Sequence, residues 1–423
     1  MTNINTNTHT KPLSALVAQH CRTLTLLISL PFISVQALAN EDHAISTFKS
    51  ITKQVAEDQD SSILAKELGI SPKQITQSLD YQKQFEKLFK VILEKYPNKI
   101  SRVWVEPAPS QQAYIQFVGK SPLLKTSLNV DVFDGGIYSF QEQEERATYL
   151  TKLLKENKYS NFMTYFDHKT GQIKLEMKTA NLSKALSLES LDTLLLNNNK
   201  LDRDEKSVFD HLSVDEIDFI VTQGQGEIYE LETARGGEWL TDGNFQKCTS
   251  GWAVSGPNGN GIVTAAHCTG LDGLDHHFTT SDPDMTWRSQ ERGNGDIEYH
   301  TTTHAESAEY WATETSLRDV TGIKSTFLML PGQSVCEYGR SSNTRTCSHT
   351  VISNNVSTTF TDGVTVSNLV RVTGDNSIGG DSGGPWSFGT VAWGVHSGSN
   401  GTTSLFTPVQ RAQSELNITI LTQ

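Results

Sequence analysis

Gly379-Gly380-Asp381-Ser382-Gly383-Gly384-Pro385 is a glycine-rich turn built around one serine. Because glycine has no Cβ, the backbone there can take up strained angles and leave room at Ser382 for a substrate carbonyl. The N–H groups of Gly380 and Ser382, turned toward that carbonyl, would hold a developing oxyanion. The turn therefore predicts a nucleophilic serine beside an oxyanion hole.

A second string, Thr264-Ala265-Ala266-His267-Cys268, supplies a histidine 115 residues before Ser382. A histidine within hydrogen-bond reach takes the serine proton as attack begins. Together, in this order, the two strings resemble the chymotrypsin-like serine proteases, most specifically the secreted bacterial streptogrisin and α-lytic protease group. The resemblance covers residues 236–423 well and the preceding region by architecture. It implies an all-β double Greek-key barrel and a serine endopeptidase that acts through an acyl-enzyme.

A serine–histidine pair needs a third group that fixes the imidazole tautomer. The best candidate is Asp296, 29 residues after His267, between a glycine turn and a short predicted strand. The bacterial members of the family carry their aspartate at this place. The rival aspartates share one turn-rich loop, where solvation is the simpler interpretation: Asp272, Asp275, Asp282 and Asp284.

Composition divides the chain near residue 236. Seven of the 31 glycines precede that position and 24 follow it. The first part predicts an α+β unit with helices from Ser71-Pro72 to Tyr96 and over 141–156, and a hairpin over 161–178. The second part predicts short strands joined by turns, with a closing helix over 408–416. A net charge of −13 argues against nucleic acid and anionic membranes as partners.

The N-terminus reads as an export signal. An apolar run from Leu24 to Val35 precedes the small-x-small site Ala37-Leu38-Ala39. We expect residues 1–39 to be a signal peptide and the protein to be secreted, in a route that can include the periplasm. An uncleaved membrane anchor is the alternative.

Four cysteines lie beyond the signal, and an even number in an exported protein indicates disulfides. The resemblance implies one bridge between Cys248 and Cys268 and another between Cys336 and Cys347. The third bridge that is usual beside the active serine is absent, which predicts a reshaped wall of the specificity pocket.

Asp381 would be a buried carboxylate beside the nucleophile, and a buried charge needs a partner. In the bacterial group that partner looks like an internal arginine, and Arg340 is at the matching position. We expect an Arg340–Asp381 ion pair. The alternative is a solvated surface arginine.

Family resemblance places the substrate pocket at Asn376 and Ser377 and along the strand that contains His396, Ser397, Gly398 and Ser399. A histidine just before Ser-Gly-Ser is similar to the glutamyl endopeptidases, so we hypothesise cleavage after Glu, with His396, Ser399 and Ser377 holding the side chain. Alternatively, His396 is a core histidine behind a chymotrypsin-like pocket. Residues 236–423 carry nine Lys and Arg against 18 Asp and Glu, and their net charge of −9 opposes acidic peptides.

Residues 40–235 resemble, in length and mixed α/β character, the pro-regions that assist folding and inhibit this group. An all-β fold with non-local contacts forms slowly, and a preorganised partner can lower that barrier. Self-cleavage after Glu230 or Glu232 would separate the two parts, whereas Arg235 would point to a trypsin-like convertase. A permanently attached binding domain is the alternative.

The competing function is a protease-like binding protein with inactive chemistry, although the chain keeps its serine, histidine and candidate aspartate. We expect no cofactor and no metal, since the remaining histidines lack metal-site spacing. They lie mostly in predicted polar loops, and we interpret them as surface residues: His276, His277, His300, His304 and His349. The expected partners are polypeptide substrates and the chain's own pro-region, in a monomer.

Overall fold

The structure is a computed structural model that describes residues 50–179, 187–198, 212–223, 237–243, 245–275, 284–303 and 306–423. The chain divides into the units Met1–His43 and Ala44–Gln423, and all described residues belong to the second. The predicted signal peptide therefore lies outside the described residues. Below, "N-terminal region" means the described residues up to 223, and "β-region" means those from 237 onward.

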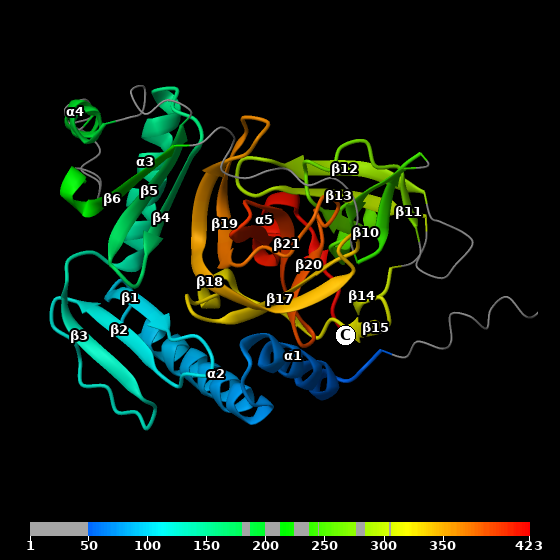
Figure 1. The fold of residues 1–423 in the computed structure, drawn as a ribbon, viewed down its shortest axis with the longest axis horizontal. Helices are drawn as coiled ribbons and strands as arrows, with labels where there is room; N and C mark the ends of the chain where they lie inside the picture. Colours follow the sequence, from blue (N-terminus) through cyan, green and yellow to red (C-terminus); the bar gives the residue numbers. More distant parts are fainter. Residues whose placement is uncertain are drawn as a thin grey trace, which may run out of the picture. The chain divides into compact units, whose positions relative to one another are not determined.

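Four α-helices and six strands make up the N-terminal region (Figure 1). The helices are α1 (Lys53–Leu68), α2 (Pro72–Lys95), α3 (Phe140–Glu156) and α4 (Leu188–Asn198). The strands are β1 (Ile100–Val105), β2 (Ala113–Val118), β3 (Val130–Gly136), β4 (Phe162–Asp167), β5 (Gln172–Thr179) and β6 (Ile217–Gln223). A short 3₁₀ turn, Val214–Glu216, precedes β6. None of the described helices is long and apolar enough to cross a membrane.

Local chemistry explains where the helices start. Ser71 caps α2 in a reciprocal capping box with Gln74, with Pro72 at the first helical position. Ser139 forms the same box with Glu142 at the start of α3. Both predicted helices, α2 and α3, and the predicted β4–β5 hairpin are confirmed.

Six strands of the β-region close into an antiparallel ring. They pair in the order β17-β20-β21-β22-β19-β18, and β18 also pairs with β17. Their bounds are β17 (Ser334–Gly339), β18 (Thr344–Thr359), β19 (Thr365–Thr373), β20 (Pro385–Phe388), β21 (Val391–Ser399) and β22 (Thr403–Pro408). Closure leaves no free edge within the ring and encloses a core that includes Trp386 and Phe406.

Two further sheets pack on their own core, which includes Leu240, Ile262 and Cys268. One has the order β12-β13-β10-β9-β23 and the other β11-β7-β8. Their bounds are β7 (Trp239–Asp242), β8 (Phe245–Thr249), β9 (Trp252–Gly256), β10 (Gly259–Thr264), β11 (Gly273–Asp275), β12 (Met285–Glu291), β13 (Ile297–Thr302) and β23 (Thr419–Ile420). The predicted closing helix is α5 (Val409–Leu416), which links β22 to β23. The all-β prediction for this half is confirmed.

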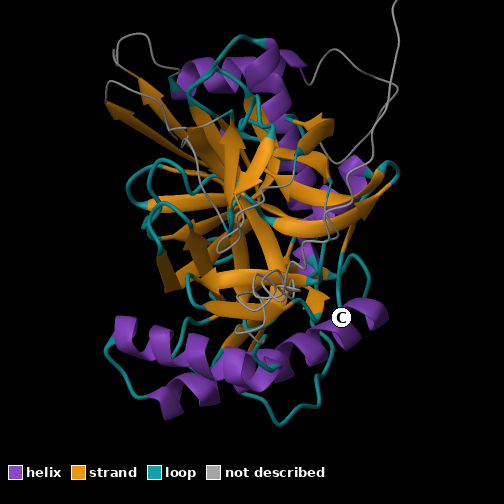
Figure 2. Ribbon diagram, turned by 90° about the vertical axis from the view of Figure 1, so that its right-hand side faces the viewer, coloured by secondary structure: helices purple, strands orange, loops and turns teal. Residues whose placement is uncertain are grey.

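Short elements join the two halves of the β-region. The strands β14 (Glu309–Thr313) and β15 (Ser316–Asp319) form a hairpin, β16 (Gly322–Ile323) pairs in parallel with β21, and Thr326–Leu328 form a 3₁₀ turn. The helices α1 and α2 lie side by side below the strands (Figure 2).

The N-terminal region and the β-region share a sheet. Val356, Ser357 and Thr358 of β18 pair antiparallel with β4, and β5 and β6 extend the same sheet (Figure 1). Main-chain hydrogen bonds therefore join two parts of the chain that the composition separates.

A buried histidine makes the N-terminal region sensitive to acid. His168 is 3% exposed, lies between Phe140 and Phe166, and accepts a hydrogen bond from the N–H of Val103. Burial lowers the pKa of His168 to about 4, from 6.5. Between these values the unfolded chain binds more protons than the folded one, so the free energy of unfolding falls as the pH falls.

The substitution His168→Gln is therefore expected to remove about 3 kcal/mol of acid destabilisation between pH 6.5 and pH 4. Glutamine keeps an acceptor but does not titrate in this range. Hydrogen exchange of peptides covering 140–177, at pH 8 and pH 4.5, measures the effect, and the parent at pH 8 is the reference. Identical loss of protection in parent and variant on acidification would contradict it.

Candidate active site

The turn around Ser382 has the backbone that its glycines predicted. Gly380 and Gly383 have φ of 113° and 87°, which L side chains rarely adopt. A Cβ on Gly383 would collide with Thr264 Oγ1 and the carbonyl of Thr249. The turn is tied to β8, since Thr249 N–H donates to Ser382 O at 2.7 Å and Thr249 Oγ1 donates to Gly380 O at 3.0 Å.

Three predicted side chains meet at this turn. His267 follows β10, Asp296 immediately precedes β13 and Ser382 precedes β20. His267 Nε2 lies 2.7 Å from Ser382 Oγ, and His267 Nδ1 lies 2.6 Å from Asp296 Oδ2. This hydrogen-bonded series can pass the hydroxyl proton from Ser382 to the imidazole and stabilise the cation that forms.

Asp296 is fully buried, and several groups hold it. Its Oδ1 accepts from the N–H of His267 at 3.1 Å, and its own N–H donates to Thr407 Oγ1 at 2.9 Å. Arg292 Nε lies 3.5 Å from Asp296 Oδ1. Arg292 was not foreseen, and the sequence carries no signal for it beyond a spacing of four residues.

The rival aspartates make other contacts. Asp272 accepts from the N–H of Gly243, and Asp275 accepts from Gln246. Asp284 is exposed. Asp282 lies outside the described residues.

A buried acid–histidine cluster lies behind the serine turn. His396 Nδ1 is 3.0 Å from Glu337 Oε1 and 3.1 Å from Trp386 Nε1. The other oxygen of Glu337 lies 3.4 Å from His349 Nε2. The prediction missed Glu337. Its strand, Ser334–Gly339, is buried at all six residues, so no alternation of polar and apolar residues marks the face on which Glu337 lies.

The other predicted pocket residues differ in exposure. Ser397, Gly398 and Ser399 are buried, all on β21. Asn376 is exposed, and Ser377 is half-buried with its Oγ donating to Asp375 Oδ1 at 3.0 Å. Gly383 N–H donates to His396 O at 2.9 Å, and Asp381 N–H donates to Ile378 O at 3.0 Å, so both segments adjoin the serine turn.

No family model matches the chain. Serine protease 1 of Streptomyces fradiae is 28% identical over 213 residues, which are 46% of this chain and 54% of that protein. Glutamyl endopeptidase 2 of Streptomyces griseus is 28% identical over 184 residues, 42% of this chain and 95% of that protein. The chain is a homologue of the bacterial chymotrypsin-like serine proteases. It spans about half the length of the first of these relatives.

Solved structures of the same kind align with this protease homologue. A glutamic-acid-specific serine protease that uses a histidine triad in substrate binding matches 44% of the chain and all of its own, at 26% identity and a TM-score of 0.37. Thermobifida fusca Protease A matches 45% of the chain and all of its own, at 28% identity and a TM-score of 0.38.

Both disulfides that the resemblance implied are present in the protease homologue. Cys248 is bonded to Cys268, with their Cα atoms 6.0 Å apart, and Cys336 is bonded to Cys347. The first ties the residue after His267 to β8. It therefore restrains the histidine and the serine turn against the same strand.

Asp381 of the homologue is held by backbone groups. Its carboxylate accepts from the N–H groups of Ser341 at 2.9 Å, Ser342 at 3.0 Å and Ile378 at 3.0 Å. Burial raises the pKa of Asp381 to about 6, and the carboxylate of Glu337 acts in the same direction.

Arg340 lies 3.2 Å from Glu314 Oε1 and over the ring of Trp239. The Arg340–Asp381 ion pair is not among the contacts described for either residue, and it stays a prediction.

Two histidines that we interpreted as surface residues are buried, so that interpretation was wrong for them. His349 is 1% exposed, and His300 is 1% exposed with Nε2 at 2.8 Å from Glu298 Oε1. Burial raises the pKa of Glu298. Alternation along β13 turns Asp296, Glu298 and His300 to one face, which here points inward. His276, His277 and His304 lie outside the described residues.

Among the described residues, one group has the spacing of a metal site: Asp60, Cys336 and Cys347. Its two cysteines form a disulfide, so their sulfurs are not thiolate ligands. This group does not fit a metal.

Proposed function

We propose that the chain is a serine endopeptidase with Ser382 as nucleophile, His267 as general base and acid, and Asp296 as the group that orients the imidazole. The observation that carries the proposal is the hydrogen-bonded series from Ser382 through His267 to the buried Asp296. Homology to Serine protease 1 and Glutamyl endopeptidase 2 supports it.

In the first half of the reaction, Ser382 Oγ attacks the carbonyl carbon of the scissile bond while its proton moves to His267 Nε2. The tetrahedral intermediate collapses, the C–N bond breaks, and His267 returns the proton to the leaving amine. An acyl-enzyme remains on Ser382. Water then repeats the sequence, with His267 as base, and releases the carboxylic acid.

The oxyanion of each intermediate is proposed to bind the N–H groups of Gly380 and Ser382. The intervening Asp381 N–H donates to Ile378 O at 3.0 Å, which fixes the turn from within. Donors already held in place cost no reorganisation when the charge develops, so they lower the barrier directly.

For the side chain before the scissile bond, we propose glutamate, bound by His396, Ser399 and Ser377, with Asn376, Ser397 and Gly398 forming the rest of the pocket. Glu337 Oε1 lies 3.0 Å from His396 Nδ1, and a carboxylate at that distance favours a cationic imidazole. Trp386 Nε1 donates to the same nitrogen at 3.1 Å, a contact that requires the neutral form. The 95% coverage of Glutamyl endopeptidase 2 supports the choice of glutamate. The buried carboxylate of Glu337 and the net charge of −9 favour the alternative, a chymotrypsin-like preference for apolar side chains.

A set of peptides that differ only in the residue before the scissile bond tests the specificity. Cleavage after Glu is expected to exceed cleavage after Gln, its neutral isostere, by about 100-fold in kcat/KM, because the pocket's donors then lose their charged partner. Faster cleavage after Phe, Leu or Arg than after Glu would contradict it. The N-terminus of the processed protein provides an independent measurement, expected to begin after Glu230 or Glu232.

We further propose that residues 40–235 are a pro-region of a secreted precursor whose signal is residues 1–39. The shared sheet supports this, because β4 pairs with the long strand β18 of the six-stranded ring. A preformed strand on which β18 can pair would shorten the search for a non-local fold. A permanently attached binding domain would instead remain joined to active protein.

A further inference from the structure

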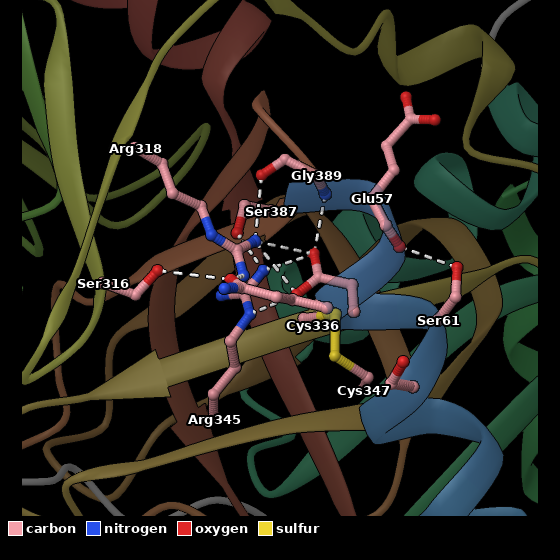
Figure 3. Close-up of polar contacts among 12 residues, drawn as sticks. Glu57, Ser61, Ser316, Arg318, Cys336, Arg345, Cys347, Ser387 and Gly389 are labelled. Atoms are coloured by element: carbon pink, nitrogen blue, oxygen red, sulfur yellow. Dashed lines mark hydrogen bonds and ion pairs between the residues drawn. A yellow bond between two sulfur atoms is a disulfide. The ribbon is translucent and has the colours of Figure 1, made fainter. Parts of the chain in front are cut away.

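A buried carboxylate joins the two regions. Asp60 of α1 is fully buried and accepts five hydrogen bonds. Arg345 donates from Nε at 2.7 Å and from Nη2 at 2.8 Å, and Arg318 Nη1 lies 2.9 and 3.0 Å from the two oxygens. The N–H of Gly389 donates at 2.7 Å (Figure 3).

The four donor atoms of these five hydrogen bonds belong to the β-region, and they come from three elements. Arg318 is on β15, Arg345 is on β18 and Gly389 is in the β20–β21 turn. We call these three residues the arginine cradle. Figure 3 shows both guanidinium groups converging beside Ser387 and Gly389, above the Cys336–Cys347 disulfide.

The cradle is built independently of Asp60. Arg345 Nη2 also donates to Ser387 Oγ at 2.9 Å, and Arg318 Nη1 donates to Gly389 O at 3.1 Å. Tyr310 Oη donates to the same carbonyl at 2.8 Å. These contacts hold both guanidinium groups in place through partners within the β-region.

The two buried guanidinium groups of the arginine cradle require an anion between them. Arg318 and Arg345 have side chains that are 1% exposed, and Asp60 is the acid paired with both. Two buried cations without an anion would carry a large desolvation penalty. Burial alone would raise the pKa of Asp60, but Arg345 and Arg318 hold it below its usual value.

Helix α1 packs closely on the β-region around the arginine cradle. Gly389 has a φ of +62°, and a Cβ there would meet Glu57 Cγ at 2.7 Å. Leu64 and Ala65 of α1 pack in one core with Cys336 and Cys347. Glu67 accepts from the N–H of Cys347 at 2.9 Å.

We propose that the arginine cradle is a carboxylate-binding site of the β-region, separate from Ser382, in which Asp60 of the N-terminal region is the ligand. The cradle holds α1 on the β-region, and it accepts a small carboxylate when Asp60 is missing. The site does not depend on catalysis, so it can be tested independently of the proposed function.

Chemical rescue tests the site in the full chain. In a Ser382→Ala background, Asp60→Ala is expected to lower the Tm by on the order of 10 °C, because the cradle loses its anion. Alanine plus formate replaces the aspartate side chain atom for atom, apart from the bond between them. Sodium formate is therefore expected to restore part of the lost Tm, in a saturable manner.

Two controls separate carboxylate binding from general salt effects. Formamide and sodium chloride at matched concentrations are expected to restore little of the Tm that Asp60→Ala loses. The second control is Asp58→Ala, because Asp58 is exposed on the same helix. Its Tm is expected to be the same in sodium formate as in sodium chloride. Equal effects of formate and chloride on Asp60→Ala would overturn the proposal. If Asp60→Ala is not recovered folded, the yield of refolding from urea is compared in the three solutes, with the same criterion.

A second measurement tests the docking role. A recognition sequence for a site-specific protease is placed within residues 224–236 of the Ser382→Ala chain, which is folded first and then cut. The N-terminal fragment is expected to dissociate at least about 100-fold more readily with Asp60→Asn than with Asp60. Equal dissociation constants for the Asp60 and Asp60→Asn proteins would show that the arginine cradle does not hold the N-terminal fragment, and would contradict the proposal.

Discussion

Replacing Ser382 with alanine is expected to lower kcat by about 10⁵- to 10⁶-fold, because attack on the carbonyl and acyl transfer both need its Oγ. His267 Nε2 lies 2.7 Å from that oxygen, so the variant removes the hydroxyl that the proposed base would deprotonate. A fluorophosphonate probe gives a second measurement. It is expected to label the parent at Ser382, located by mass spectrometry, and to leave Ser382→Ala unlabelled.

The matched control is Ser414→Ala, since Ser414 is exposed on α5 and its hydroxyl donates to Arg411 O. Its rate and labelling are expected to equal those of the parent. Absence of labelling in processed parent protein would favour the inactive, protease-like binding protein instead.

The second large effect is expected from Asp296→Asn, about 10⁴-fold in kcat/KM. The carboxylate accepts from His267 Nδ1–H at 2.6 Å, which leaves Nε2 free to take the serine proton. A carboxamide can donate to Nδ1, and the proton then resides on Nε2, where it blocks that transfer. Asparagine keeps the size of the side chain, so the loss reports the tautomer rather than packing.

Asp284→Asn is the control, because Asp284 is exposed and belongs to the loop of rival aspartates. It is expected to leave kcat/KM within about twofold of the parent. A loss of less than tenfold in Asp296→Asn, or a comparable loss in Asp284→Asn, would remove Asp296 from the proposed mechanism. Both rates are measured on the best peptide of the specificity panel.

Much of the site was accessible from local sequence. The backbone geometry of the two turns requires the glycines around Ser382 and the small residues before His267. These requirements act over a few neighbouring residues, so a short motif in the sequence reveals them. Asp296 was less evident, because its role depends on a contact over 29 residues. Its position before a strand, together with the family resemblance, was enough to select it.

The burial of charged and polar groups was not accessible in this way. We expected His300 and His349 in polar loops, but they lie on β13 and β18. Both side chains are buried, each within reach of a buried glutamate.

By itself, the sequence determined the serine turn, the histidine string, the division near residue 236 and the helices α2 and α3, because caps, turns and periodicity act between neighbours. Only the tertiary structure decided that Asp60 lies between Arg318 and Arg345, 258 and 285 residues away. Each of these residues alone looks like an ordinary surface charge. They form ion pairs because the fold buries them together, and that burial depends on which distant strands pair.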